Sequence, residues 1–151
     1  MRKLHGVVFS LILAGFILVG PAALHGQTTW YVDDDAPGDP GPGDPLVSDP
    51  AEDGSAGHPF DAIQKAVNAA AAGDTVTVAD GIYTGHGNRD IKFHGKGITV
   101  ASENGPAACI IDIEHDTSRP GFNFSSGETP DARVEGFTIV NGDSTDGGAF
   151  R

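Results

Sequence analysis

The densest set of chemically active side chains in this sequence is a run of acidic residues between Thr28 and Gly57. It contains eight carboxylates and no Lys or Arg: Asp33, Asp34, Asp35, Asp39, Asp44, Asp49, Glu52 and Asp53. Ca²⁺ prefers clustered carboxylate and carbonyl oxygens, so the first four are the candidate metal ligands: Asp33, Asp34, Asp35 and Asp39. The spacing is not that of an EF-hand loop. Since five prolines interrupt the run, a solvated loop or extended spacer is the alternative interpretation.

Two further sets of charged residues are candidates for binding. Asn88-Arg89-Asp90 places a guanidinium beside a carboxylate, which is either a functional pair or an ordinary surface ion pair. Asp112 and Glu114 are two residues apart, so in a strand both point to one face. That face binds a cation or a sugar hydroxyl, or it is simply solvated.

The histidines and the single cysteine give no catalytic constellation. His86, His94 and His115 lie in separate predicted turns without metal-ligand spacing, so we interpret them as surface residues. Cys109 lies in an apolar Cys-Ile-Ile run and is expected to be a small buried residue. One thiol cannot close an internal disulfide.

Two residue types recur at intervals along the second half of the chain. The phenylalanines are either sugar-stacking platforms or part of an interior stack: Phe122, Phe124 and Phe137. The asparagines are candidates for a structural ladder of stacked amides at the corners of the fold: Asn104, Asn123 and Asn141.

The N-terminal segment, positions 1–26, has the layout of a secretory signal peptide. A basic start is followed by an apolar run from Val7 to Gly20 and then by small residues. The run is shorter than a membrane span needs, and Pro21 ends it. We expect cleavage between Ala23 and Gln27, no membrane association afterwards, and a secreted, extracellular or cell-surface protein.

The remaining chain is strongly acidic. The sequence has nine Lys and Arg residues, two of them in the predicted signal peptide, against 21 Asp and Glu residues. The exported chain therefore carries a formal charge of 7 minus 21, or −14. Such a charge argues against nucleic acid and anionic lipid as partners.

A helix is predicted over residues 58–73. Phe60, Ile63, Val67 and Ala70 fall at steps of three and four and line one face. Asp61 suits the first turn, and Gly73 suits a left-handed C-terminal cap. So short a helix needs a surface to lie on.

Short apolar strands follow the helix, separated by Gly, Asn, Asp and Pro. They are expected at 75–78, 91–93, 98–100, 109–111, 122–124 and 134–140. A repeat of roughly 22–25 residues with two or three short strands predicts a stacked β-solenoid. The helix would cover the exposed hydrophobic end of its first coil.

The stretch PFDAIQKAVNAAAAGDTVTVADGIY, together with ITVASENGPAACIID and VEGFTIVNG, resembles the right-handed parallel β-helix, or pectin-lyase-like, superfamily. The resemblance covers residues 58–151, and the Asp/Pro-rich 27–57 resembles the lead-in of secreted bacterial members. It implies an all-β right-handed parallel β-helix with an N-terminal capping α-helix, here the cap and first coils of a longer protein.

The resemblance does not decide the function, because this fold hosts lyases, hydrolases, tailspikes, adhesins and non-catalytic proteins. No arginine lies in the Arg-x-Pro-x-x-Arg setting of pectate lyases, and the Asp-Asp motif of the hydrolases is missing within a coil. Two hypotheses stay open. One is a secreted non-catalytic scaffold or surface module that binds polysaccharide or stacks on another β-helix chain. The other is the N-terminal part of a polysaccharide lyase or glycoside hydrolase with catalytic residues beyond Arg151.

The calcium hypothesis predicts that added Ca²⁺ raises the melting temperature of the exported protein, because a ligand that binds only the folded state stabilises it. Protease cleavage within residues 33–53 should slow in parallel. If millimolar Ca²⁺ changes neither quantity relative to Mg²⁺, the acidic run is a solvated loop.

Overall fold

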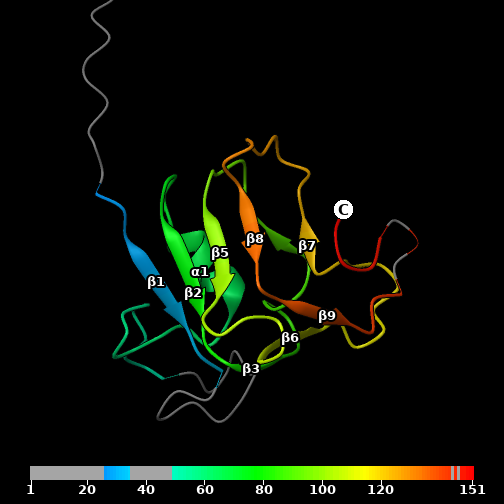
Figure 1. The fold of residues 1–151 in the computed structure, drawn as a ribbon, viewed down its shortest axis with the longest axis horizontal. Coiled ribbons are helices and arrows are strands. Elements are labelled where there is room, and N and C mark those ends of the chain that lie inside the picture. The colour runs from blue at the N-terminus through cyan, green and yellow to red at the C-terminus, as the bar shows by residue number, and fades with distance from the viewer. Residues whose placement is uncertain (1–25, 35–48, 144, 146) are drawn as a thin grey trace, which may run out of the picture.

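The computed structural model describes residues 26–34, 49–143, 145 and 147–151. The predicted signal peptide, except Gly26, and the candidate ligands Asp35 and Asp39 lie outside the described residues. The described residues form nine short strands and one helix (Figure 1). They are β1 (Thr29–Val32), α1 (Ile63–Ala69), β2 (Thr75–Val78), β3 (Gly81–Tyr83), β4 (Ile91–Lys92), β5 (Thr99–Ser102), β6 (Cys109–Asp112), β7 (Phe122–Asn123), β8 (Arg133–Glu135) and β9 (Thr138–Val140).

The described strands belong to three parallel sheets, with orders β1-β2-β5-β8, β3-β6-β9 and β4-β7. Successive segments of the chain supply one strand to each sheet in the same sequence, and Phe150 forms a parallel bridge with Phe122. Thr75 pairs with Thr99, and Thr99 pairs in turn with Arg133. The interval from residue 99 to residue 133 is longer than the interval from 75 to 99. The spacing of equivalent residues is therefore less regular than predicted. The mostly-β class predicted from the sequence is confirmed.

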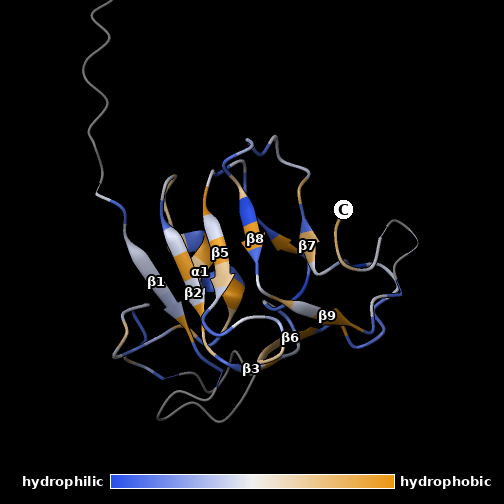
Figure 2. Ribbon diagram, viewed as in Figure 1, coloured by the Kyte–Doolittle hydropathy of each residue, from blue (hydrophilic) through white to orange (hydrophobic). Residues whose placement is uncertain are grey.

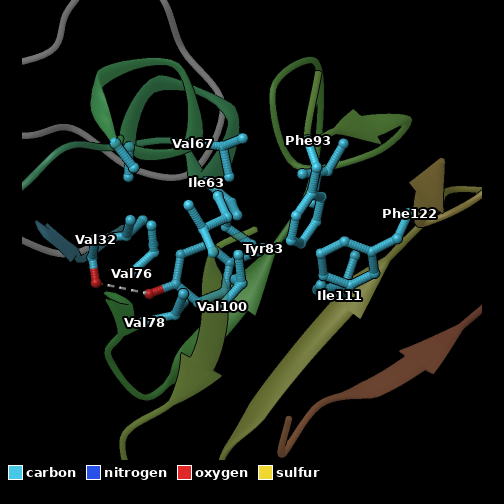
Figure 3. Packing of buried hydrophobic residues seen from close by; sticks show 14 of the residues in the cluster. Val32, Ile63, Val67, Val76, Val78, Tyr83, Phe93, Val100, Ile111 and Phe122 are labelled. Carbon is cyan, nitrogen blue, oxygen red and sulfur yellow. Dashed lines mark hydrogen bonds between the residues drawn. The ribbon is translucent and has the colours of Figure 1, made fainter. Parts of the chain in front are cut away.

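The core lies between the three sheets. Alternate residues of each longer strand point inward, so Val76 and Val78 of β2 are fully buried while Thr75 and Thr77 are not. The parallel register places identical side chains beside each other in neighbouring strands, as with Val76 and Val100. Figure 3 shows this cluster, with the Tyr83 hydroxyl directed at the Val32 carbonyl oxygen (3.4 Å).

The helix α1 covers one end of this core. Its predicted apolar face is confirmed, because Ile63, Val67 and Ala70 are buried. It packs against β1, β2 and β4, and Figure 3 shows Ile63 and Val67 pointing into the cluster. Phe60, just before it, stacks on Trp30 with ring centroids 6.1 Å apart.

The helix is shorter than the predicted 58–73, and its ends are satisfied by other residues than expected. Ile63 N donates to Asn88 Oδ1 (2.9 Å), since Ala62 at the N-cap has no side-chain acceptor. At the other end Lys96 Nζ donates to the carbonyls of Val67, Asn68 and Ala70. The roles predicted for Asp61 and Gly73 are therefore wrong. Asp61 precedes the helix and pairs with Lys65 (2.7 Å), and Gly73 lies in the turn to β2 with φ 93°.

One predicted strand is also wrong. Residues 134–140 do not form a single strand, because Gly136 adopts φ 77° and turns the chain between β8 and β9. A side chain there is unfavourable, since a Cβ on Gly136 would collide with the Ser102 hydroxyl. The two halves join different sheets.

The outer edge of β1 is covered by residues 54–60. Tyr31 N donates to Gly54 O (2.9 Å), Phe60 N to Tyr31 O (2.9 Å) and Asp33 N to Phe60 O (3.0 Å). Residues predicted as a separate lead-in thus complete the first sheet and close its edge. The described part of the chain contains no helix with the length and apolar character to cross a membrane.

The buried carboxylate of Asp74, just before β2, binds the start of β1 and the residues that follow α1. Its oxygens accept hydrogen bonds from Thr28 N (2.9 Å), Trp30 Nε1 (3.0 Å) and Ala71 N (2.9 Å). Asp74 is only 5% exposed, so these donors would lose their partner inside the protein if the carboxylate were removed.

We predict that Asp74→Ala lowers the free energy of unfolding by about 3 kcal/mol, because hydrogen bonds to a charged group contribute roughly 1.5–3 kcal/mol each and are not additive. Urea unfolding followed by Trp30 fluorescence measures the change. Asp131→Ala, at an exposed position, is the matched control and should change it by less than about 0.5 kcal/mol. Equal losses in both variants would contradict this role for Asp74.

Candidate functional site

A polar groove of about 400 Å³ lies beside α1, β4 and the loop before β4. A smaller hollow of about 180 Å³ adjoins it and shares four of its residues. The groove is lined by Gln64, Asn68, His86, Gly87, Arg89, Asp90, Lys92, His94 and Arg119. Its residues come from the helix and from two successive segments of the chain.

Two amide side chains fix the position of this loop against the helix. The buried Asn88 accepts from Ile63 N and donates from Nδ2 to Thr84 O (3.0 Å). The Gln64 amide binds both backbone groups of Lys92, with Oε1 accepting from the amide (2.8 Å) and Nε2 donating to the carbonyl (3.1 Å). The walls of the groove are thereby held by α1.

Arg89 connects the groove to the next segment of the chain. Its Nη1 pairs with Glu114 Oε2, and its Nε lies 3.5 Å from Asp116 Oδ2. Arg119 Nη1 reaches the same Asp116 oxygen at 3.5 Å. Hydrogen bonds from the Ser118 hydroxyl and amide lower the pKa of Asp116, so it remains a carboxylate between the two guanidinium groups.

Asp90 is the carboxylate within the groove. It accepts from Asn123 Nδ2 (2.8 Å) and pairs with Lys92 Nζ (3.0 Å). Burial acts to raise the pKa of Asp90, but these contacts outweigh it and the pKa is lowered. Asp90 and His94 both have positive φ, of 52° and 55°, a conformation that Asp and His adopt more readily than most residues.

The groove gathers cationic side chains in an acidic protein. Three of the seven Lys and Arg residues beyond the predicted signal peptide line it, together with two exposed histidines. The side chains of Lys92 and Arg119 are 42% and 45% exposed. Each has more donors than its carboxylate partners use, so the groove offers hydrogen-bond donors to an anionic ligand.

Of the four predicted metal ligands, Asp33 and Asp34 lie in the described residues, and the calcium site stays a prediction. Asp34 is buried, and its carboxylate lies where a Cβ on Gly81 would fall. No group of three or more His, Cys, Asp or Glu side chains with metal-binding geometry occurs in the described ranges. Farther along the run, Asp49 accepts from Ala51 N (2.8 Å) and Asp53 from Ser55 N (2.9 Å), as in ordinary Asx turns.

Asp112 and Glu114 do not share a strand face as predicted. The strand β6 ends at Asp112, and Glu114 adopts φ 55°. Asp112 accepts from Asn141 Nδ2 (2.9 Å), whereas Glu114 pairs with Arg89. The two carboxylates therefore serve different contacts.

Among the remaining sequence candidates, the cysteine, the phenylalanines and the asparagines are structural, whereas His86 and His94 line the groove. The histidines are exposed, and burial raises the pKa of Cys109 to about 12. The three phenylalanines pack on the core, with Phe124 4.9 Å from Phe93 between ring centroids. In place of a stacked amide ladder, each asparagine binds an aspartate of the preceding segment: Asn104 with Asp80, Asn123 with Asp90, and Asn141 with Asp112.

Sequence reasoning found Arg89 and Asp90 but missed Gln64, Lys92 and Arg119. Gln64 lies on α1, Lys92 on β4 and Arg119 in the loop before β7, and the packing of β4 against α1 and β7 brings them together. Comparisons of the chain with protein-family models, curated proteins and solved structures found no match.

We predict a specific acid dependence at Asp90. Because the pKa of Asp90 is lowered in the folded state, the ionised side chain stabilises the protein above the unfolded-state pKa of about 3.9. This stabilisation is lost as the pH falls through the folded-state pKa. Asp90→Asn should therefore be less stable than wild type at pH 7, and the difference should shrink below about pH 4. Urea unfolding across this range measures it, with the exposed Glu103→Gln as control. Parallel stability curves for wild type and Asp90→Asn would contradict the assignment.

Proposed function

We propose that this chain is a secreted, non-catalytic scaffold with a right-handed parallel β-helix fold, and that it binds an acidic polysaccharide in the groove beside β4. The fold is supported by the three parallel sheets, each taking strands from successive segments in the same order. Right-handedness is expected because crossover connections between parallel strands have that hand in almost all proteins. Secretion rests on the signal-peptide pattern of residues 1–26.

The observation that carries the binding function is the concentration of exposed donors in the groove. Lys92, Arg119 and the two histidines lie around an open volume of about 400 Å³. Arg and Lys recognise carboxylates through charge-assisted hydrogen bonds, and Arg does so bidentately. Asn68 is exposed and accepts from Gln64 Nε2 through Oδ1 (2.9 Å), so its amide NH2 group adds donors of the kind that bind sugar hydroxyls. A chain of uronic acids presents both groups.

We predict that the protein binds hexagalacturonate and that added salt weakens this binding, because exposed charge interactions are screened. Arg119→Ala and Lys92→Ala should each reduce the affinity about tenfold, the effect of losing one charge-assisted hydrogen bond. Isothermal titration calorimetry measures the affinities. Arg133→Ala removes an exposed cation outside the groove and should leave the affinity unchanged. Equal binding of the neutral cellohexaose would exclude an anion site.

The same oligosaccharide distinguishes a scaffold from an enzyme. A non-catalytic module leaves hexagalacturonate intact, with neither unsaturated uronides nor new reducing ends after prolonged incubation. Detectable cleavage of hexagalacturonate would reject the scaffold hypothesis and favour the alternative, a polysaccharide lyase or glycoside hydrolase.

A further inference from the structure

The outer edge of β8 is unpaired in the described part of the chain. β8 is the last strand in the order β1-β2-β5-β8, and no described residue pairs with its outer side. Arg133 N donates to Ile98 O (2.9 Å) on the inner side. Since backbone groups alternate along a strand, the amide and carbonyl of Val134 point outward. The edge therefore presents one donor and one acceptor at the centre of a three-residue strand.

The side chains that flank Val134 carry opposite charges. Arg133 and Glu135 are both exposed, and β8 is drawn mainly in the hydrophilic colour (Figure 2). Neither residue forms an ion pair with another described residue. Charges on an edge strand commonly prevent pairing, but a positive and a negative charge placed symmetrically about a central residue are self-complementary.

We propose that this edge binds a second copy of the chain, with the two β8 strands antiparallel about a two-fold axis at Val134. The two Val134 residues would exchange both outward hydrogen bonds, as opposed residues do in a hydrogen-bonded antiparallel pair. Arg133 of each copy then lies opposite Glu135 of the other, on the same face of the joined sheet. One two-fold contact thus forms two ion pairs.

Apolar surface beside β8 supports the same contact. A hollow of about 300 Å³ is lined by Val134, Gly136, Phe137, Ile139, Ala149 and Phe150. Phe150 is 50% exposed, and Ile82 is the other exposed large hydrophobic residue among those described. A two-fold axis at Val134 exchanges the two flanks of β8, so the Phe150 side of one copy faces the β9 side of the other.

The geometry favours a closed dimer over a filament. The opposite edge of the sheet, at β1, is covered by residues 54–60, and α1 covers that end of the core. Of the two edges of this sheet in the described structure, only the β8 edge can pair, and an isologous contact at one end closes after two copies. This interaction is independent of ligand binding in the groove.

Sedimentation equilibrium of the purified protein over a range of concentrations tests the proposal. Wild type should dimerise reversibly, and Arg133→Glu or Glu135→Arg alone should weaken association at least tenfold, because each places like charges opposite each other twice. The double variant Arg133→Glu with Glu135→Arg restores both pairs and should recover the wild-type association within about threefold. Arg119→Glu, with the same charge change in the groove, should associate like wild type.

Circular dichroism confirms that each variant is folded, and the double variant separates a charge effect from misfolding. A wild-type protein that stays monomeric at all concentrations would overturn the proposal and assign Arg133 and Glu135 to protecting the edge. Dimers that persist in both single variants, or no recovery in the double variant, would place any interface elsewhere.

Discussion

The structure depends on each strand lying in register beside its counterpart from the preceding segment. None of the described strands is longer than four residues, and such short strands are not stable alone or as a single pair. Parallel register places Val76 beside Val100 and Val100 beside Val134, so one line of the core is a continuous column of the same side chain. A one-residue slip would turn the threonines of β2 inward.

The helix α1 also depends on contacts with other segments of the chain. With seven residues, α1 is far shorter than the roughly 12–15 residues at which an isolated helix is even marginally stable. Its amide end is capped by Asn88 and its carbonyl end by Lys96, which both lie later in the chain. The stability of the helix therefore depends on the segment containing β4, and the groove beside β4 depends on the same contacts.

The sequence predicts the elements whose pattern is local and misses the contacts that join distant segments. The apolar face of Ile63 and Val67 is visible in the spacing of these residues, and it is buried as expected. The predicted helix ends are wrong because the capping side chains, Asn88 and Lys96, lie in later segments of the chain. The break at Gly136 has no signal in the apolar run around it, because a glycine inside a strand pattern is compatible with several conformations. In the candidate site, adjacent residues such as Arg89 and Asp90 could be selected, but a groove wall made by Gln64 and Lys92 required knowledge of the register.

Register also explains how an acidic chain tolerates stacked segments. Neighbouring strands lie about 4.8 Å apart, so equal charges at equivalent positions would repel strongly in successive segments. The chain places a neutral amide or an opposite charge beside carboxylates of the preceding or following segment: Asp80 with Asn104, Asp90 with Asn123, Asp112 with Asn141, and Arg89 with Glu114. Three asparagines that could have formed a ladder of like residues are used as hydrogen-bond donors to carboxylates. Cations are scarce in this sequence, and those beside β4 are placed where two segments bring carboxylates together. The cations of the groove therefore compensate carboxylates of two segments, and they retain more hydrogen-bond donors than these carboxylates use.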